Sequence, residues 1–271
     1  MFPRLISIGS FSLPTYGVLI AIAFATALWV TVRLGERTKL DKERVTNLGI
    51  YSALVGLLGA KILMILFDLP AYLSRPGEIF TLATLQAAGV FQGGLVLAVV
   101  FAFLYTRHFR MPWLATFDAF APGIAIGHAI GRLGCLAAGC CWGKVCDRPW
   151  AITFTNTQAT TGVPLYQPLH PTQLYEAACE AAVFAFLYRR FAKPHRSGTI
   201  IGLYLVVSSI LRFTVEFFRY HEQALPFGLP LSITQWISLG LIVVGAGLLW
   251  IARAAGREDR SKRRRGCGPV M

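Results

Sequence analysis

The sequence predicts an all-α polytopic membrane protein with seven transmembrane helices and an outward-facing loop cap. Of its 271 residues, 55% are hydrophobic and only 14% are charged, whereas soluble domains average about 25% charged residues. Hydropathy separates seven apolar stretches of roughly 18–23 residues, each long enough to cross a hydrocarbon core of about 30 Å. Because lipid offers no partners to backbone groups, these spans are expected to be helical.

The spans follow one another with short connections on one side of the membrane and long ones on the other. Residues 1–252 are expected to form a single transmembrane domain, and 253–271 a basic tail. The long loops, 68–88 and 139–172, exceed what a simple connection needs and predict the cap. The predicted spans are 14–33, 46–67, 89–107, 118–138, 173–189, 198–219 and 231–252.

Basic residues predict the orientation. The chain carries 26 Lys and Arg residues and a net charge of +13. Most of these residues fall around 33–45, 107–110 and 189–196 and in the tail, all on one side of the predicted membrane. Cytoplasmic loops are enriched in Lys and Arg, so the N-terminus is expected outside and the C-terminus in the cytoplasm. The positive charge is thereby explained by topology, and no nucleic-acid partner is expected.

The fourth span contains the most unusual segment, residues 123–143. Gly123, Gly127 and Gly131 recur every fourth residue, and small residues at that spacing predict a close-packing helix face. Arg132 follows directly, inside an otherwise uncharged run. A charge within a span costs about 2.5–3.5 kcal/mol on insertion scales. Arg132 therefore needs either an internal partner or a ligand.

A second set of charges lies at the end of the sixth span. Arg212 and Glu216 are spaced to share one helical face, and Arg219 follows one turn later. One interpretation is an internal ion pair of Arg212 with Glu216 that holds two helices together. The other is that Arg132 and Arg212 flank an anionic group that enters the membrane, since the planar guanidinium binds phosphate through two charge-assisted hydrogen bonds.

The cysteines leave several interpretations open. Three of the six, Cys135, Cys140 and Cys141, gather at the end of the fourth span, and Cys146 follows. This spacing is not the paired C-x-x-C pattern of a structural zinc site, so no metal is expected. A disulfide from Cys140 or Cys141 to Cys146, buried free thiols that serve as small apolar side chains, and a thiol used in chemistry all remain possible.

The order of motifs along the chain resembles the prolipoprotein diacylglyceryl transferase family. Residues 91–94 stand where the family reads F-H-G-G, and 170–176 match its H-P-S-Q-L-Y-E. Residues 212–219 match R-x-x-V-E-F-F-R. Further matches are Tyr16 with Gly17, Asp118, residues 131–134, Gly139, Trp142 and Gly143.

The resemblance implies an enzyme of the bacterial inner membrane. Such enzymes transfer the diacylglyceryl group of phosphatidylglycerol to the lipobox cysteine thiol of a prolipoprotein signal peptide, release glycerol phosphate and need no cofactor. By position, Arg132 and Arg212 would hold the phosphate, and Gln92 completes the candidate catalytic residues. The candidate substrate-binding residues are Tyr16, Gly93, Gly94, Asp118, Cys135, Gly139, Cys140, Gly143, His170, Glu216 and Arg219.

The chain also departs from the family pattern. Gln92 replaces the histidine of F-H-G-G, and an amide cannot act as a general base. Cys135 and Cys140 stand where the family has asparagine and often glutamate. Three explanations are open: the base is dispensable, His128 or His170 substitutes for it, or the enzyme uses a different acceptor. A lipid-binding protein or transporter without catalysis and a thiol redox membrane protein are the remaining hypotheses.

Overall fold

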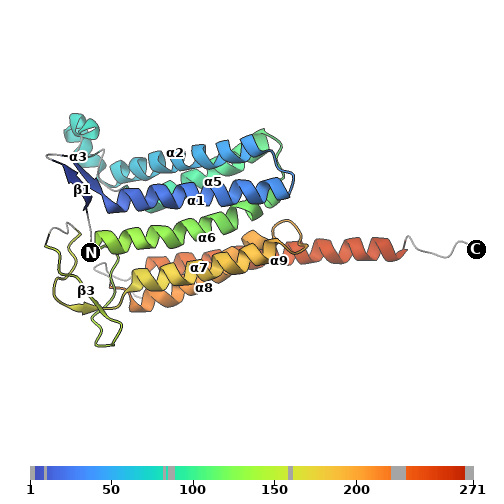
Figure 1. Ribbon diagram of the computed structural model, residues 1–271. Helices are drawn as coiled ribbons and strands as arrows, with labels where there is room; N and C mark the ends of the chain where they lie inside the picture. Colours follow the sequence, from blue (N-terminus) through green and yellow to red (C-terminus); the bar gives the residue numbers. More distant parts are fainter. Residues whose placement is uncertain are drawn as a thin grey trace, which may run out of the picture. The chain divides into compact units, whose positions relative to one another are not determined.

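A computed structural model describes residues 4–8, 11–81, 84, 89–157, 161–220 and 230–265. These residues are mostly helical, as the sequence predicts, and the chain divides into two compact units (Figure 1). The first unit comprises residues 1–33 and 117–271, and the second comprises 34–116. The helices of the first unit are α1 (Thr15–Arg37), α6 (Trp113–Ala138), α7 (Thr172–Phe191), α8 (Thr199–Val215), η2 (Glu216–Phe218) and α9 (Ile233–Arg265). The last residues of α1 and the first residues of α6 belong to the second unit.

Within the part of the chain that the structure describes, six helical segments are long and apolar enough to cross a membrane. They correspond to six of the seven predicted spans, and helix α7 coincides with the remaining one, 173–189. Helix α7 lies outside this apolar set, because it carries Glu176 and Glu180 on its buried face and ends in Arg189 and Arg190. The six segments are 15–37, 42–67, 91–108, 113–138, 199–218 and 233–254.

The spaced glycines of α6 form a packing face against α1, as the sequence predicts. A Cβ atom on Gly123 would lie 2.6 Å from the Ala27 carbonyl oxygen, and one on Gly127 would lie 3.0 Å from the Ala27 Cβ. Further along, Gly134 faces the ring of Tyr16. The contacts run in opposite directions along the two helices, so α1 and α6 pack antiparallel. This contact sets Tyr16 beside the C-terminal part of α6.

Helix α8 packs against both α7 and α9. Its contact with α9 is close at Gly202, where a Cβ atom would lie 3.0 Å from the Leu249 side chain and 3.1 Å from the Gly245 carbonyl oxygen. Toward α7, α8 presents polar residues instead, and Ser208 donates a hydrogen bond to Glu180. One face of α8 is thus packed by apolar contacts and the other by hydrogen bonds and charges.

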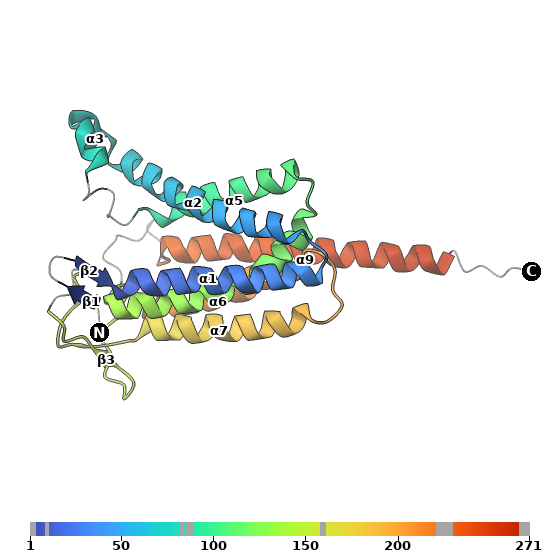
Figure 2. The ribbon, with the colours of Figure 1, turned by 45° about the horizontal axis from the view of Figure 1, so that its top comes forward.

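The described residues also form two small β-sheets, which the all-α prediction did not include. Strands β1 (Arg4–Ile8) and β2 (Phe11–Pro14) pair antiparallel just before α1, and β3 (Ile152–Thr153) pairs antiparallel with β4 (Pro168–Leu169) in the loop after α6. That loop has its own apolar cluster of Phe154, Val163 and Leu169. Both sheets lie at the end where α1 begins and α6 ends (Figure 2).

The second unit is built on one helix pair. Its elements are α2 (Lys42–Phe67), α3 (Leu69–Ser74), η1 (Pro76–Phe80) and α5 (Phe91–His108). Helices α2 and α5 meet through glycines: a Cβ atom on Gly93 would lie 2.5 Å from the Gly59 carbonyl oxygen, and one on Gly94 would lie 2.7 Å from that of Gly56. Gly93 and Gly94 therefore permit helix packing, while the neighbouring Gln92 is exposed.

Replacing Gly123 by alanine is expected to destabilise the contact of α1 with α6. The added methyl group overlaps the Ala27 carbonyl, and overpacking of this kind costs about 1–3 kcal/mol, which exceeds the gain in helix propensity of about 1 kcal/mol. The Gly247→Ala variant is the matched control, since a Cβ atom there meets nothing within 4 Å. Thermal unfolding in detergent should show a lower midpoint for Gly123→Ala alone, and equal midpoints would contradict the packing face.

Candidate active site

Two arginines of the first unit converge on one buried carboxylate, Glu176 of α7. Its Oε2 pairs with the Arg132 guanidinium of α6, and its Oε1 pairs with that of Arg212 on α8. The Glu176 side chain is only 5% exposed, and the two arginine side chains are 15% and 17% exposed. Three helices are therefore joined by a single carboxylate in a largely dehydrated environment.

A second buried carboxylate, that of Glu216, also pairs with the arginines. Glu216 lies 3.2 Å from Arg212 Nη2, so the ion pair of the first interpretation is present, although it lies within the continuous segment of α8 and η2 and does not join two helices. Arg219 contacts the same two carboxylates at longer distance, with Nη1 3.9 Å from Glu176 and 3.8 Å from Glu216. Ser232 donates to the other oxygen of Glu216 at 3.0 Å. The arginines are thus held by hydrogen-bonded carboxylates, as buried cations require.

His128 connects this network to a third carboxylate. Its Nε2 lies 3.1 Å from Arg132 Nε, and its Nδ1 lies 3.3 Å from Glu180 Oε1. A small cavity opens beside these groups and borders both Glu176 and Arg212. Among the histidines considered as substitutes for the missing base, His128 is therefore the one within the arginine network.

His170 lies in a different setting. Its Nδ1 is 3.1 Å from the Tyr175 hydroxyl, and its ring stacks edge-on against Phe218. The backbone N–H of Gly143 donates to the His170 carbonyl at 3.1 Å, and Gly143 pairs with Arg219 in a β-bridge. A Cβ atom on Gly143 would lie 2.5 Å from the His170 Cβ. Gly143 and His170 thus position the segment that carries Arg219, Gly143 through the β-bridge and His170 through its contact with Phe218.

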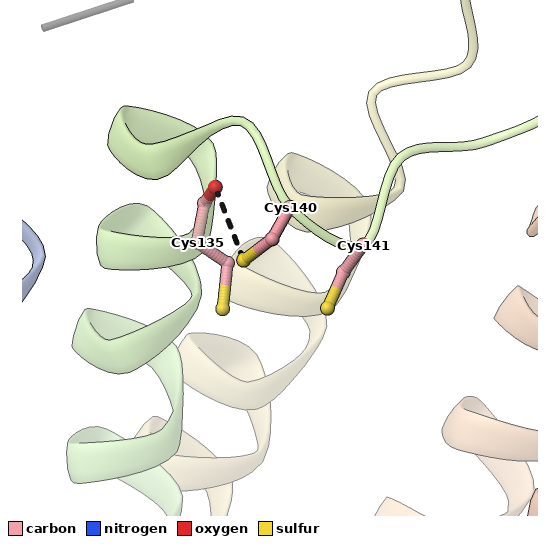
Figure 3. Close-up of side chains that lie close together, drawn as sticks. All are labelled: Cys135, Cys140 and Cys141. Atoms are coloured by element: carbon pink, nitrogen blue, oxygen red, sulfur yellow. Dashed lines mark hydrogen bonds between the residues drawn. The ribbon is translucent and has the colours of Figure 1, made fainter. Parts of the chain in front are cut away.

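Three thiols lie close together at the end of α6 (Figure 3). Cys135 is on the last turns of α6, and Cys140 and Cys141 follow in the turn that ends it, where Gly139 has a φ of 74°. Arg132 Nη1 is 4.0 Å from Cys135 Sγ. Among the described residues, Cys135, Cys140, Cys141, Cys146 and Cys179 are all free thiols, so the considered disulfide to Cys146 is absent.

The charge around Cys141 favours its ionised form. Hydrogen bonds from the Cys135 and Cys140 thiols lower the pKa of the Cys141 thiol well below its usual range, and the Arg219 and Arg132 guanidinium groups act in the same direction. A thiolate is the reactive and metal-binding form of cysteine.

The remaining predicted residues lie in three places. Tyr16 lies beside the C-terminal part of α6, where a Cβ atom on Gly134 would be 3.3 Å from its ring. Asp118 lies about 21 Å from Arg132 along α6 at 1.5 Å per residue. Its carboxylate accepts the N–H groups of Gly198 and Ile201 at 2.7 and 2.8 Å and so stabilises the start of α8. Gln92 belongs to the second unit, and its part in the site stays a prediction.

Sequence reasoning missed the central residue. The sequence indicated only that Arg132 needs an internal partner or a ligand, whereas the structure pairs it with Glu176 of another helix. Glu176 ends the matched segment 170–176, and a second acidic residue follows it one helical turn later at Glu180. Two carboxylates one turn apart in a predicted span were the signal that could have identified it.

These features define a multi-pass membrane protein with a buried site of arginines, carboxylates and thiols. A sequence profile described as prolipoprotein diacylglyceryl transferase matches residues 3–251. The chain belongs to this family.

Three relatives illustrate the similarity, and each is named phosphatidylglycerol–prolipoprotein diacylglyceryl transferase. The protein from Bordetella parapertussis is 34% identical over 94% of this chain and 97% of its own length. The protein from Vibrio cholerae is 31% identical over 95% of this chain and 94% of its own length. The protein from Nitrosomonas europaea is 30% identical over 97% of this chain and 94% of its own length. The similarity therefore extends over nearly the whole of both chains in each comparison.

Glu176→Gln is expected to destabilise the protein, because it removes the charge shared by Arg132 and Arg212 while it keeps the side-chain shape. Breaking a buried ion pair from one side costs about 3–5 kcal/mol. The same substitution at Glu78, whose pair with Arg75 is exposed, is the control and should leave the melting temperature unchanged. If both variants melt like the wild type in detergent, Glu176 does not stabilise the arginines.

Proposed function

We propose that the protein transfers the diacylglyceryl group of phosphatidylglycerol to the lipobox cysteine thiol of a prolipoprotein and releases glycerol phosphate. The observation that carries the proposal is the convergence of Arg132 and Arg212 on one buried carboxylate in a member of this family. The names of the relatives include both proposed substrates, phosphatidylglycerol and prolipoprotein. The signal peptide with its lipobox cysteine is the proposed acceptor, and no cofactor is part of this proposal.

The Glu176 carboxylate indicates how a lipid phosphate binds. Each of its two oxygens pairs with a different arginine, and the two non-bridging oxygens of a phosphodiester can bridge the same guanidinium groups. The headgroup phosphate thus competes with Glu176 for Arg132 and Arg212. Glu216 keeps its contact with Arg212 during this exchange and preserves the orientation of the guanidinium.

The arginines also stabilise the leaving group. When the acceptor sulfur attacks the glyceryl carbon, the bond from that carbon to the phosphate oxygen breaks, and negative charge grows on the departing phosphate. Fixed cations aimed at such developing charge lower the barrier, and loss of one such group typically costs about 100-fold or more in rate. Arg219, which contacts the same carboxylates, is proposed to add to this positive field.

The remaining candidate residues are proposed to shape the lipid site. Tyr16 lies beside the C-terminal part of α6, and Gly139 and Gly143 allow the loop after α6 to fold back on the site. His170 supports this loop, and Gln92 is proposed to orient a substrate through its amide. The other proposed substrate-binding residues are Gly93, Gly94, Asp118, Cys135, Cys140 and Glu216.

The proposed setting is the bacterial inner membrane, with α7 as the seventh span. Its acidic face would be shielded from lipid by Arg132 of α6 and by Arg212 and Ser208 of α8. Residues 1–252 are proposed to form one transmembrane domain, capped outside by 68–88 and 139–172. The N-terminus is proposed to lie outside and the tail 253–271 in the cytoplasm.

A related transferase with a different acceptor is the second candidate. It is favoured by Gln92, which stands where the family has histidine, and by Cys135 and Cys140 in the family signature. These changes affect groups that would handle the acceptor, whereas the arginines that would hold the lipid are kept. Mass spectrometry of acceptors after reaction with labelled phosphatidylglycerol distinguishes the two candidates.

Arg132→Ala and Arg212→Ala are each expected to reduce transfer about 100-fold or more, with the protein still in the membrane. The measurement is the release of glycerol phosphate from phosphatidylglycerol vesicles with a lipobox peptide as acceptor. Arg190→Ala is the control, because Arg190 bonds only an exposed backbone carbonyl in the described structure, that of Pro194. Full activity in either site variant would refute the phosphate role.

Reporter fusions test the proposed orientation. A fluorescent protein that matures only in the cytoplasm should fluoresce when it is fused after residue 271. Alkaline phosphatase, which is active only outside the cytoplasm, should be active when it is inserted in the loop 139–172. The reverse pattern would overturn the assignment made from the Lys and Arg distribution.

A further inference from the structure

The three thiols at the end of α6 form a compact cluster. The Sγ atoms of Cys135, Cys140 and Cys141 all lie within 4.8 Å of one another, and each side chain is half-buried. Figure 3 shows the three side chains directed to the same region from the helix end and the following turn. The sequence spacing did not predict a metal site, because only the reversal of the chain after Ala138 brings these residues together.

The backbone holds these thiols in place. Cys141 has a φ of 61°, a left-handed conformation that is rare for a residue with a side chain and that is often found at functional sites. Thr172 and Gln173, both buried at the start of α7, donate hydrogen bonds to the Cys141 and Cys140 carbonyls at 2.8 and 2.7 Å. The Cys140 N–H bonds the Cys135 carbonyl at 3.0 Å. These hydrogen bonds hold the turn and thereby fix the positions of the three sulfur atoms.

Three convergent cysteine sulfurs suit a zinc ion. With Zn–S distances of about 2.3 Å, two sulfurs on one tetrahedral zinc lie about 3.8 Å apart, so small side-chain movements bring the cluster to this spacing. Three protein ligands leave one tetrahedral position open, as in catalytic rather than structural zinc sites. The Arg132 guanidinium, 4.0 Å from Cys135 Sγ, offsets the excess negative charge of three thiolates on a divalent ion.

We propose that Cys135, Cys140 and Cys141 bind one Zn²⁺ ion through three thiolates, and that the open fourth position takes the acceptor thiol and activates it. The activation half of this inference rests on the proposed transferase function, whereas zinc binding does not. Zinc coordination deprotonates a thiol, which is the task that Gln92 cannot perform as a base. The nucleophile would then be bound beside Arg132, one of the two groups that hold the leaving phosphate.

The step balances without any redox change. The acceptor thiol binds Zn²⁺ and its proton passes to solvent water. The zinc-bound sulfur then donates an electron pair to the glyceryl carbon, and the bond between that carbon and the phosphate oxygen breaks with its electron pair on the phosphate. The products are a thioether and glycerol phosphate. The thioether, which is uncharged and a weaker ligand than a thiolate, leaves the zinc.

Metal analysis of the purified full-length protein tests the site directly. Wild-type protein produced with added zinc is expected to hold one Zn²⁺ per chain. Cys140→Ser and Cys141→Ser should each weaken zinc binding by about tenfold or more, since even changes outside the direct ligands cost 10- to 100-fold. Cys179→Ser is the matched control, because Cys179 lies on α7 outside the cluster. Wild-type protein without zinc, or variants that bind it equally, would overturn the site.

Cobalt exchange tests the open position without relying on turnover. Co²⁺ in the site should give sulfur-to-metal charge-transfer and ligand-field absorption, which should change when a lipobox cysteine peptide is added. The same peptide with serine in place of cysteine should leave the spectrum unchanged. An identical spectrum with both peptides would overturn binding of the acceptor thiol at the metal.

Transfer assays separate this inference from the function it rests on. Zinc-free protein is expected to lose transfer and to regain it when zinc is restored. Undiminished transfer without zinc overturns the activation step and leaves the proposed function in place. Zinc bound at the three cysteines with no transfer by zinc-loaded wild type overturns the activation step together with the proposed function, and upholds the metal site alone.

Discussion

The structure of the first unit depends on the carboxylate that Glu176 shares between Arg132 and Arg212. Neither α6 nor α8 can bury its arginine within an apolar environment without a counter-charge, because the desolvation of an unpaired cation is too unfavourable. Helix α7 supplies that charge, which explains why it is not among the helical segments that are apolar enough to cross a membrane. The same pairing fixes how α6, α7 and α8 face one another, since all three must present their charged residues to one place.

This arrangement also sets the chemistry that the site can perform. An internal carboxylate that bridges two arginines can be exchanged for an external phosphate with little change in the surrounding charges. The thiol cluster adjoins the same arginine, with Cys135 Sγ 4.0 Å from Arg132. An anionic leaving group and a sulfur nucleophile can therefore be held side by side, which is the requirement of a thiol alkylation. Cys135 and Cys140, which differ from the family pattern, both lie in this thiol cluster.

Much of the architecture could be predicted from the chain. The glycines from Gly123 onward were correctly interpreted as a packing face, and the Arg212 pair with Glu216 follows from their spacing on one helix. The partner of Arg132 could not be found in this way, because Glu176 lies on another helix and local spacing says nothing about which faces meet. Asp118 illustrates the same difficulty, since its hydrogen bonds to α8 come from residues far along the chain.

The sequence by itself determined the helical membrane class, six of the apolar spans, the burial of charge and the family, because hydropathy, charge and motif order are properties of short segments. Only the tertiary structure decided that Glu176 joins the arginines, that Gly93 and Gly94 pack against α2, and that Cys135, Cys140 and Cys141 share one site. These outcomes depend on how helices pack and on how the chain reverses after α6. The left-handed turn at Cys141, held by Thr172 and Gln173, brings the sulfur atoms of three cysteines that are near in sequence into one cluster, and no spacing rule anticipates it.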